Sequence, residues 1–121
     1  MYDAIIVGAG PSGSSAAFHC NKLGLKTLLL DKSSFPRDKV CGDALSGKSV
    51  KLLDEMGLLD GLNELDGAII NRIIFGNPNH SECELHLNKS LNKRHISNGY
   101  VIPRKSFDNY LFSAASEGSD V

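Results

Sequence analysis

The sequence predicts an α/β fold, and two stretches of the chain carry this prediction. The first is an apolar run, AIIV at 4–7, followed by the glycine-rich turn GAGPSG, a helical pattern and a second apolar run, KTLLLD at 26–31. Strand, helix and strand in this order make a βαβ unit, and uninterrupted apolar runs are typical of parallel strands buried on both faces. The second stretch, 68–98, contains two strand-like runs around the turn sequence GNPN and predicts an inserted β-hairpin.

The helix after the glycine turn has clear start and stop signals. Pro11 suits the first helical turn, where its missing N–H is no loss, and Gly24 is a good C-terminal stop. Mostly small side chains recur at helical spacing, and we expect them to form the face that packs on the sheet: Ala16, Ala17, Cys20 and Leu23.

The later elements follow from the same kinds of pattern. The polar segment 33–43 contains Pro36 and predicts an extended loop, and a helix is expected over 45–56. In the hairpin, 68–75 is expected to form one strand and 82–87 the other, with alternation leaving one face wet. A short strand in GYVIPR then precedes a helix that starts near Arg104, and the final GSDV suggests the start of another strand. We expect an N-terminal piece of a longer protein.

Composition narrows the classes of function. The 13 Lys and Arg against 14 Asp and Glu give a formal net charge of −1, without the basic surplus that nucleic-acid binding favours. A basic cluster at 89–95 is interpreted as a solvated loop. No run approaches the length of a membrane span and the start lacks a secretory signal, so we expect a cytoplasmic protein, for which peripheral membrane contact remains open.

Cysteine and histidine spacing argues against metals and disulfides. The three cysteines, Cys20, Cys41 and Cys83, are an odd number without a C-x-x-C pair, and the four histidines show no metal-ligand spacing. We therefore expect no metal site. Cys20 and Cys83 are expected to be buried as small hydrophobic side chains.

The first glycine loop has the context of a Rossmann-like dinucleotide site. Gly8, Gly10 and Gly13 make G-x-G-x-x-G between a strand and a helix. These glycines permit the tight turn, the approach of a pyrophosphate, and close packing of the helix, whose N-terminus attracts the phosphates. Asp31 ends the second strand, where its carboxylate can accept hydrogen bonds from ribose hydroxyls and disfavours a 2′-phosphate. This pattern does not by itself distinguish FAD from NAD.

A second glycine-rich stretch, GDALSGKS at 42–49, matches the phosphate-loop pattern G-x-x-x-x-G-K-[ST] of nucleotide triphosphatases. A phosphate loop needs a buried hydrophobic strand leading into it, whereas FPRDKVC contains a proline and three charges. We interpret the match as accidental, with Lys48 and Ser49 exposed on a helix. A Mg-dependent ATPase or GTPase stays the competing enzyme class.

Three segments resemble one family of flavoenzymes. DAIIVGAGPSGSSAA followed by LLLDK looks like the N-terminus of FAD-dependent oxidoreductases with the p-hydroxybenzoate-hydroxylase type of fold. PRDKVCGD at 36–43 is similar to the Lys-x-Cys-Gly segment of the geranylgeranyl reductase family. IPRKSFDNYLFSAASEGSDV at 102–121 resembles the Arg-x-x-Phe-Asp-x-x-Leu helix of the same proteins.

The resemblance implies a set of FAD-binding residues. The pyrophosphate would be held by Gly8, Gly10, Pro11, Ser12 and Gly13. Asp31 and Lys32 would border the adenosine, and Arg104 would lie against the cofactor. Cys41, Gly42 and Asp43 would line the flavin side, and Val121 would begin the strand beside the adenine. Cys41 is the candidate catalytic residue, and we expect Arg37 and Lys39 to favour its thiolate.

The resemblance also implies the reaction and the domain arrangement. Reduced flavin would pass a hydride to a carbon–carbon double bond of an isoprenoid chain, and a proton would reach the other carbon. An external donor, NADPH or a reduced carrier, would supply electrons. Residues 1–121 would form the N-terminal part of the FAD-binding domain, with 68–98 reaching toward a substrate domain. A hydroxylase or halogenase on the same scaffold and a non-catalytic dinucleotide-binding module remain alternatives.

Overall fold

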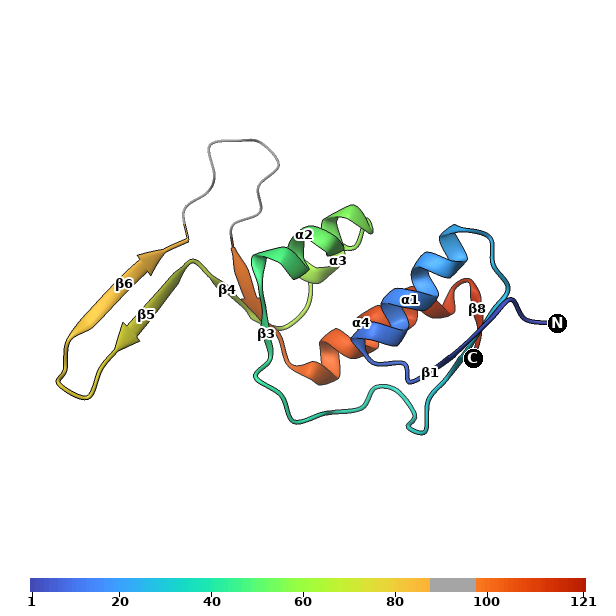
Figure 1. Ribbon diagram of the computed structural model, residues 1–121, viewed down its shortest axis with the longest axis horizontal. Coiled ribbons are helices and arrows are strands. Elements are labelled where there is room, and N and C mark those ends of the chain that lie inside the picture. The colour runs from blue at the N-terminus through green and yellow to red at the C-terminus, as the bar shows by residue number, and fades with distance from the viewer. Residues whose placement is uncertain (88–97) are drawn as a thin grey trace. The chain divides into compact units, whose positions relative to one another are not determined.

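The computed structural model describes residues 1–87 and 98–121, and the chain divides into two compact units (Figure 1). The first unit comprises Met1–Cys41 and Arg104–Val121, and the second comprises Gly42–Pro103. The basic cluster at 89–95 and the polar loop around it lie outside the described residues. No helix within the described ranges has the length and apolar character needed to cross a membrane.

The first unit confirms the predicted βαβ arrangement. Its elements are β1 (Ala4–Val7), α1 (Pro11–Lys22), β2 (Thr27–Leu30), α4 (Arg104–Ser116) and β8 (Ser119–Asp120). The strands form a parallel sheet in the order β1-β2-β8, with Ala4 opposite Thr27 and Val7 opposite Leu30. The last strand differs from the prediction at its start: Ser119 already pairs with Thr27, so Val121 follows β8 instead of beginning it.

A small core joins the sheet of this unit to its two helices. Ala9, Ala17, Leu29 and Ala115 are fully buried, and Phe35 and Phe112 pack against them. Asn21 on α1 donates a hydrogen bond to the Ala115 carbonyl (2.8 Å) and accepts one from the Ser119 hydroxyl (3.0 Å). These bonds tie α1 to the end of α4 and the start of β8.

The buried face of α1 agrees only in part with the predicted one, which included Ala17. Ser14 and Ala17 are buried, whereas Ala16 is exposed and Leu23 is 76% exposed. The rotation of the helix is set at its start, because Gly13 packs directly against the Gly8 carbonyl. Ser14 and Ala17, which lie three positions apart on one side of the helix, are therefore the side chains that are buried.

The second unit is built from short strands and two helices. Its elements are β3 (Ala44–Leu45), α2 (Gly47–Glu55), α3 (Leu59–Asn63), β4 (Ala68–Ile70), β5 (Arg72–Gly76), β6 (Glu82–His86) and β7 (Gly99–Val101). An antiparallel sheet has the order β3-β7-β4, and β5 pairs with β6 as a separate hairpin. Among the described residues of this unit, the buried apolar side chains are Val50, Leu53, Met56, Leu62, Tyr100 and Ile102.

The segment 42–49 leads from a loop through the two-residue strand β3 into the start of α2. Residues 32–43 contain no helix or strand, so no buried strand leads into the phosphate-loop pattern. Helix α2 begins at Gly47, later than predicted, because the Ser46 side chain caps it by accepting the Ser49 N–H (3.3 Å). Lys48 is exposed as predicted, while Ser49 is half-buried.

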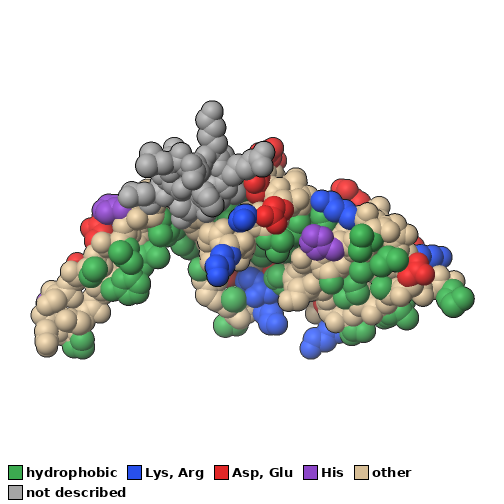
Figure 2. Space-filling model, turned by 45° about the horizontal axis from the view of Figure 1, so that its top comes forward, with side chains coloured by type: hydrophobic (Ala, Val, Ile, Leu, Met, Phe, Trp, Pro, Cys, Tyr) green, Lys and Arg blue, Asp and Glu red, His purple; other side chains and the backbone are tan. Residues whose placement is uncertain are grey.

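The predicted strand over 68–75 is two strands in two different sheets. The chain changes partner at Asn71: Ile70 pairs with Gly99 on β7, and Arg72 pairs with His86 on β6. The apolar side chains Ile73 and Leu85 lie opposite each other, as alternation predicts. This face is nevertheless exposed together with the polar one, and hydrophobic side chains gather on the hairpin surface in Figure 2.

The cysteines are less buried than predicted. Cys83 lies on the hairpin and is exposed, and Cys20 on α1 is only half-buried. Cys83 is exposed because no other described element covers the hairpin face that carries it.

Candidate dinucleotide-binding site

A cleft of about 1000 Å³ in the first unit lies where β1 and β2 end and α1 begins. This is the carboxyl edge of the parallel strands, where ligands bind in open α/β sheets. Most of the site residues predicted from sequence line it: Gly8, Gly10, Pro11, Ser12, Gly13, Asp31, Lys32 and Arg104. The structure therefore brings together residues from both ends of the chain.

Each glycine of the loop meets a different requirement. Gly8 has φ +101°, a conformation that side chains rarely adopt. A Cβ on Gly13 would lie 1.7 Å from the Gly8 carbonyl oxygen, so the helix start approaches the end of β1 too closely for any side chain.

Gly10 differs from both of these glycines. Its φ of −69° and ψ of −174° suit any residue, and within 4 Å a Cβ there would meet only the Arg37 side chain, 3.2 Å from Nη2. Neither the backbone conformation nor the packing of this unit demands a glycine at this position. A side chain at Gly10 would instead fill part of the cleft, which fits a ligand that lies against the loop backbone.

The N-terminus of α1 is open to an anion. Its cap residue is Gly10, no side chain caps it, and its first turn contains no acidic residue. The first N–H groups of a helix have no acceptor within the helix, and the helix dipole adds partial positive charge there. The Ser14 hydroxyl does not serve as a phosphate donor, because it donates to the Ala9 carbonyl (2.9 Å). Since the helix start is uncapped, the backbone N–H groups of Ser12 and Gly13 can receive a phosphate.

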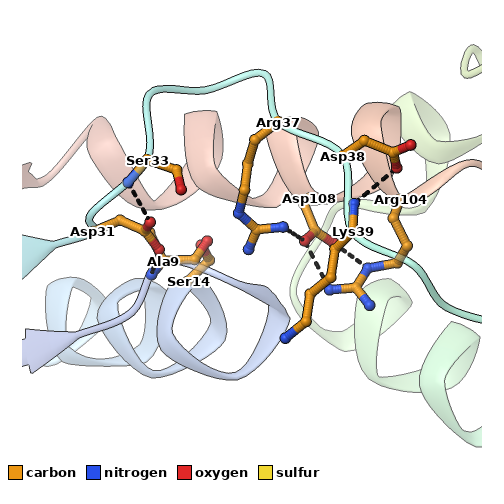
Figure 3. Close-up of polar contacts among 9 residues, drawn as sticks. All are labelled: Ala9, Ser14, Asp31, Ser33, Arg37, Asp38, Lys39, Arg104 and Asp108. Carbon is orange, nitrogen blue, oxygen red and sulfur yellow. Dashed lines mark hydrogen bonds and ion pairs between the residues drawn. The ribbon is translucent and has the colours of Figure 1, made fainter.

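Asp31 holds the glycine loop in place (Figure 3). Its Oδ2 accepts the Ala9 N–H (2.7 Å) and its Oδ1 accepts the Ser33 N–H (2.8 Å). These hydrogen bonds, that from Ala9 first, lower the pKa of the carboxyl from its ordinary value of 3.8. Each oxygen keeps a lone pair that can accept a hydroxyl. The sequence indicated only a contact with ribose, whereas the structure adds this bridge between β1 and the loop after β2.

We predict that Asp31 makes the stability of this unit depend on pH in the acid range. A lowered pKa in the folded state means that the stabilisation is complete at neutral pH and is lost as the pH falls below 3.8. The difference in free energy of unfolding between the wild type and Asp31→Asn should therefore shrink on acidification through that range. Urea unfolding at neutral and acid pH measures it. A difference that stays constant at all pH values would refute the prediction.

Two arginines share one buried carboxylate at the other side of the cleft (Figure 3). Asp108 on α4 has no solvent exposure, and its Oδ1 and Oδ2 accept hydrogen bonds from Arg104 Nε (2.7 Å) and Nη2 (2.8 Å). Oδ2 also accepts from Arg37 Nη1 (2.8 Å). Phe35 lies under the Arg37 guanidinium, 4.9 Å from ring centre to Cζ, and stacks on Phe112.

The sequence placed Arg37 only in the surroundings of Cys41, and it indicated no role for Asp108. The spacing of Arg104 and Asp108, four residues apart on a helix, is a signal that was available in the sequence. The pairing of Arg37 with Asp108 joins residues 71 positions apart, and no local pattern indicates it.

The surroundings of Cys41 differ from those predicted. Arg37 is engaged by Asp108, and it is the Arg104 side chain that hydrogen-bonds Cys41. The pKa of Arg104 is raised, first by its hydrogen bonds to Asp108, against the opposite effect of partial burial, and further by Cys41.

The remaining predicted residues lie elsewhere in the chain. Gly42 and Asp43 belong to the second unit, and Val121 is 64% exposed after β8. Their roles stay predictions.

A parallel βαβ unit with this glycine loop, an open helix N-terminus and a terminal acid defines a dinucleotide-binding protein. The sequence model of one protein family, described as an FAD binding domain, matches residues 1–121. The chain belongs to this family of FAD-dependent proteins.

Similar proteins include both reductases and halogenases. The digeranylgeranylglycerophospholipid reductase of Methanocaldococcus jannaschii is 34% identical over 123 residues, covering 100% of this chain and 28% of its own length. A geranylgeranyl bacteriochlorophyll reductase-like structure from Thermoplasma acidophilum has a TM-score of 0.76 and 31% identity, covering 99% of this chain and 29% of its own. The structure of the myxobacterial chondrochloren halogenase has a TM-score of 0.86 and 25% identity, and the match covers 99% of this chain and 28% of the halogenase chain. The chain thus spans 28–29% of the length of these proteins.

Proposed function

We propose that this FAD-dependent protein acts as a geranylgeranyl-reductase-like oxidoreductase, which reduces carbon–carbon double bonds of an isoprenoid chain. The observation that carries the proposal is the 34% identity to a digeranylgeranylglycerophospholipid reductase along 100% of the chain. The flavin supplies the hydride chemistry when bound. An external electron donor, NADPH or a reduced carrier, completes the cycle.

The chain's own residues bind and orient the cofactor in this proposal. Gly8, Gly10 and Gly13 let the loop approach the diphosphate, and the α1 N-terminus with Pro11 and Ser12 receives its charge. Asp31 and Lys32 border the adenosine. Because Asp31 is ionised at neutral pH, it repels a 2′-phosphate and favours FAD over a phosphorylated dinucleotide.

Val121 is proposed to lie near the adenine. Cys41, Gly42 and Asp43 are proposed to line the flavin side of the cofactor, and Arg104 is proposed to lie against the cofactor. Arg104 lines the cleft and hydrogen-bonds Cys41, so it can hold that side chain near a bound ligand. Cys41 is the candidate catalytic residue: it is an exposed residue, and its thiol is proposed to hold a proton close to the flavin. The β5–β6 hairpin, with its exposed apolar face, is proposed to reach toward a substrate domain.

Flavin uptake tests the cofactor site first. We expect the full-length protein to show flavin absorbance after addition of FAD, and Lys48→Ala to take up the same amount. Lys48 is exposed on α2, outside the cleft, and serves as a matched control for the phosphate-loop interpretation. Flavin uptake that fails while Mg-ATP binds in a Lys48-dependent way would overturn the proposal.

The reaction itself is tested with chemically reduced flavin and a geranylgeranyl lipid. Mass spectrometry should detect two added hydrogens per reduced double bond. The second candidate function, halogenation, is favoured by the TM-score of 0.86 to the chondrochloren halogenase. It predicts instead that the enzyme with oxygen and halide transfers a halogen to an aromatic acceptor while the lipid stays unchanged.

A further inference from the structure

We propose that Asp108 is a positioning residue of the cofactor site: it holds Arg37 beside Gly10, so that the Arg37 guanidinium can bind the diphosphate of FAD. This inference rests on the proposed function of the glycine loop. It assigns a role to a buried carboxylate that does not line the cleft itself.

The carboxylate is the centre of a three-residue charge cluster. Asp108 is completely buried, while the side chains of Arg37 and Arg104 are 18% and 13% exposed. Three hydrogen bonds of 2.7–2.8 Å join the two guanidinium groups to one carboxylate. One excess positive charge therefore remains, and both arginines line the cleft.

Arg37 is held on two sides and keeps a donor for the ligand. Nη1 donates to Asp108, and the Phe35 ring lies 4.9 Å from Cζ. Nη2 lies next to the loop, 3.2 Å from where a Cβ of Gly10 would stand. A planar guanidinium can donate to Asp108 through Nη1 and to a phosphate through Nη2 at the same time, whereas a lysine ammonium carries all its donors on one nitrogen and lacks this fixed, separated pair.

Stability alone is a weak reason for this cluster. Burying a carboxylate costs solvation energy, and replacing a buried ion pair by apolar residues of similar size is often neutral or stabilising. Phe107, Leu111 and Ala115 already give α4 a buried apolar face. A cluster that presents its excess positive charge at the loop is better explained by an anionic ligand.

A double-mutant cycle in the full-length protein tests the proposal. FAD affinity is measured by flavin fluorescence for the wild type, Asp108→Asn, Arg37→Ala and the double variant, with ligand-free melting temperatures alongside. Asp108→Asn should weaken FAD binding about tenfold to a hundredfold, the value of a lost hydrogen bond between charged groups. In the Arg37→Ala background the same change should have little further effect. An equal loss in both backgrounds, which a merely structural role would give, overturns the proposal.

If Asp108→Asn does not fold, the Arg37→Lys variant tests the same proposal. It leaves Asp108 and Arg104 paired and keeps the positive charge. We expect it to bind FAD as weakly as Arg37→Ala, whereas binding equal to wild type would show that charge alone suffices and would overturn the inference. A wild-type protein that binds no FAD defeats the proposed function as well. Wild-type binding with unaffected variants defeats only the role of Asp108.

Discussion

Replacing Gly13 by alanine is expected to prevent the βαβ unit from folding correctly. The added Cβ would lie 1.7 Å from the Gly8 carbonyl oxygen and 2.9 Å from its carbon, both backbone atoms. Relief requires α1 to move away from β1, which would open the core around Ala9 and Ala17. We expect a loss of more than about 3 kcal/mol in the free energy of unfolding, beyond the usual cost of overpacking.

Urea unfolding followed by circular dichroism measures this loss, and Gly10→Ala is the matched control. Gly10 has a φ of −69°, and its Cβ would meet only the end of the Arg37 side chain, at 3.2 Å, which a shift of a few tenths of an ångström relieves. Alanine there should leave stability unchanged or raise it by up to about 1 kcal/mol, because it restricts the unfolded chain. If both variants were equally stable, the close contact between Gly13 and Gly8 would not exist in the folded protein.

Replacing Gly10 by valine is expected to abolish FAD binding while the protein stays folded. The backbone conformation at this position accepts a side chain, but the branched group would occupy the cleft in front of the α1 N-terminus. A diphosphate could then no longer reach the N–H groups of the first turn. We expect FAD affinity to fall more than about a hundredfold, since several charge-assisted hydrogen bonds are lost together.

Two measurements on Gly10→Val distinguish a lost cofactor site from a lost fold. Gly10→Val should have a melting temperature without FAD close to that of the wild type, and it should lose the increase that FAD gives the wild type. Ligand titration by fluorescence and thermal melting together separate the two effects. Unchanged FAD affinity in a folded Gly10→Val protein would show that the cofactor binds elsewhere.

Local patterns were sufficient for the part of the fold that holds the glycine loop. Strand, turn and helix follow one another within a few residues, and each glycine and proline acts on its own segment of backbone. The parallel pairing of β1 with β2 is likewise confirmed. It could be predicted because a short crossover through a single helix places consecutive strands side by side and parallel. The loop predicted over 33–43 from its polar composition and its proline is also confirmed, since these residues contain no helix or strand.

Prediction was weaker where an element has more than one available partner. The run 68–75 looks like one strand, but its first half pairs with β7 and its second half with β6. The periodicity of α1 correctly predicted that Ala17 is buried, but it also placed Ala16 and Leu23 on that face, whereas Ser14 is buried in their place. In the strand the choice of partner overrides the local pattern, and in the helix the close contact of Gly13 with Gly8 does so.

The sequence by itself determined the class of the site: a glycine loop between strand and helix, with Asp31 at the end of the next strand, specifies a dinucleotide. Only the tertiary structure decided how the rest of the site is built. Asp31 bonds back to Ala9, and Asp108 joins Arg104 to Arg37, which lies 71 positions before Asp108 in the sequence. The physical reason is that a backbone turn depends on neighbouring residues, whereas a charge cluster depends on which helix the chain brings to the loop.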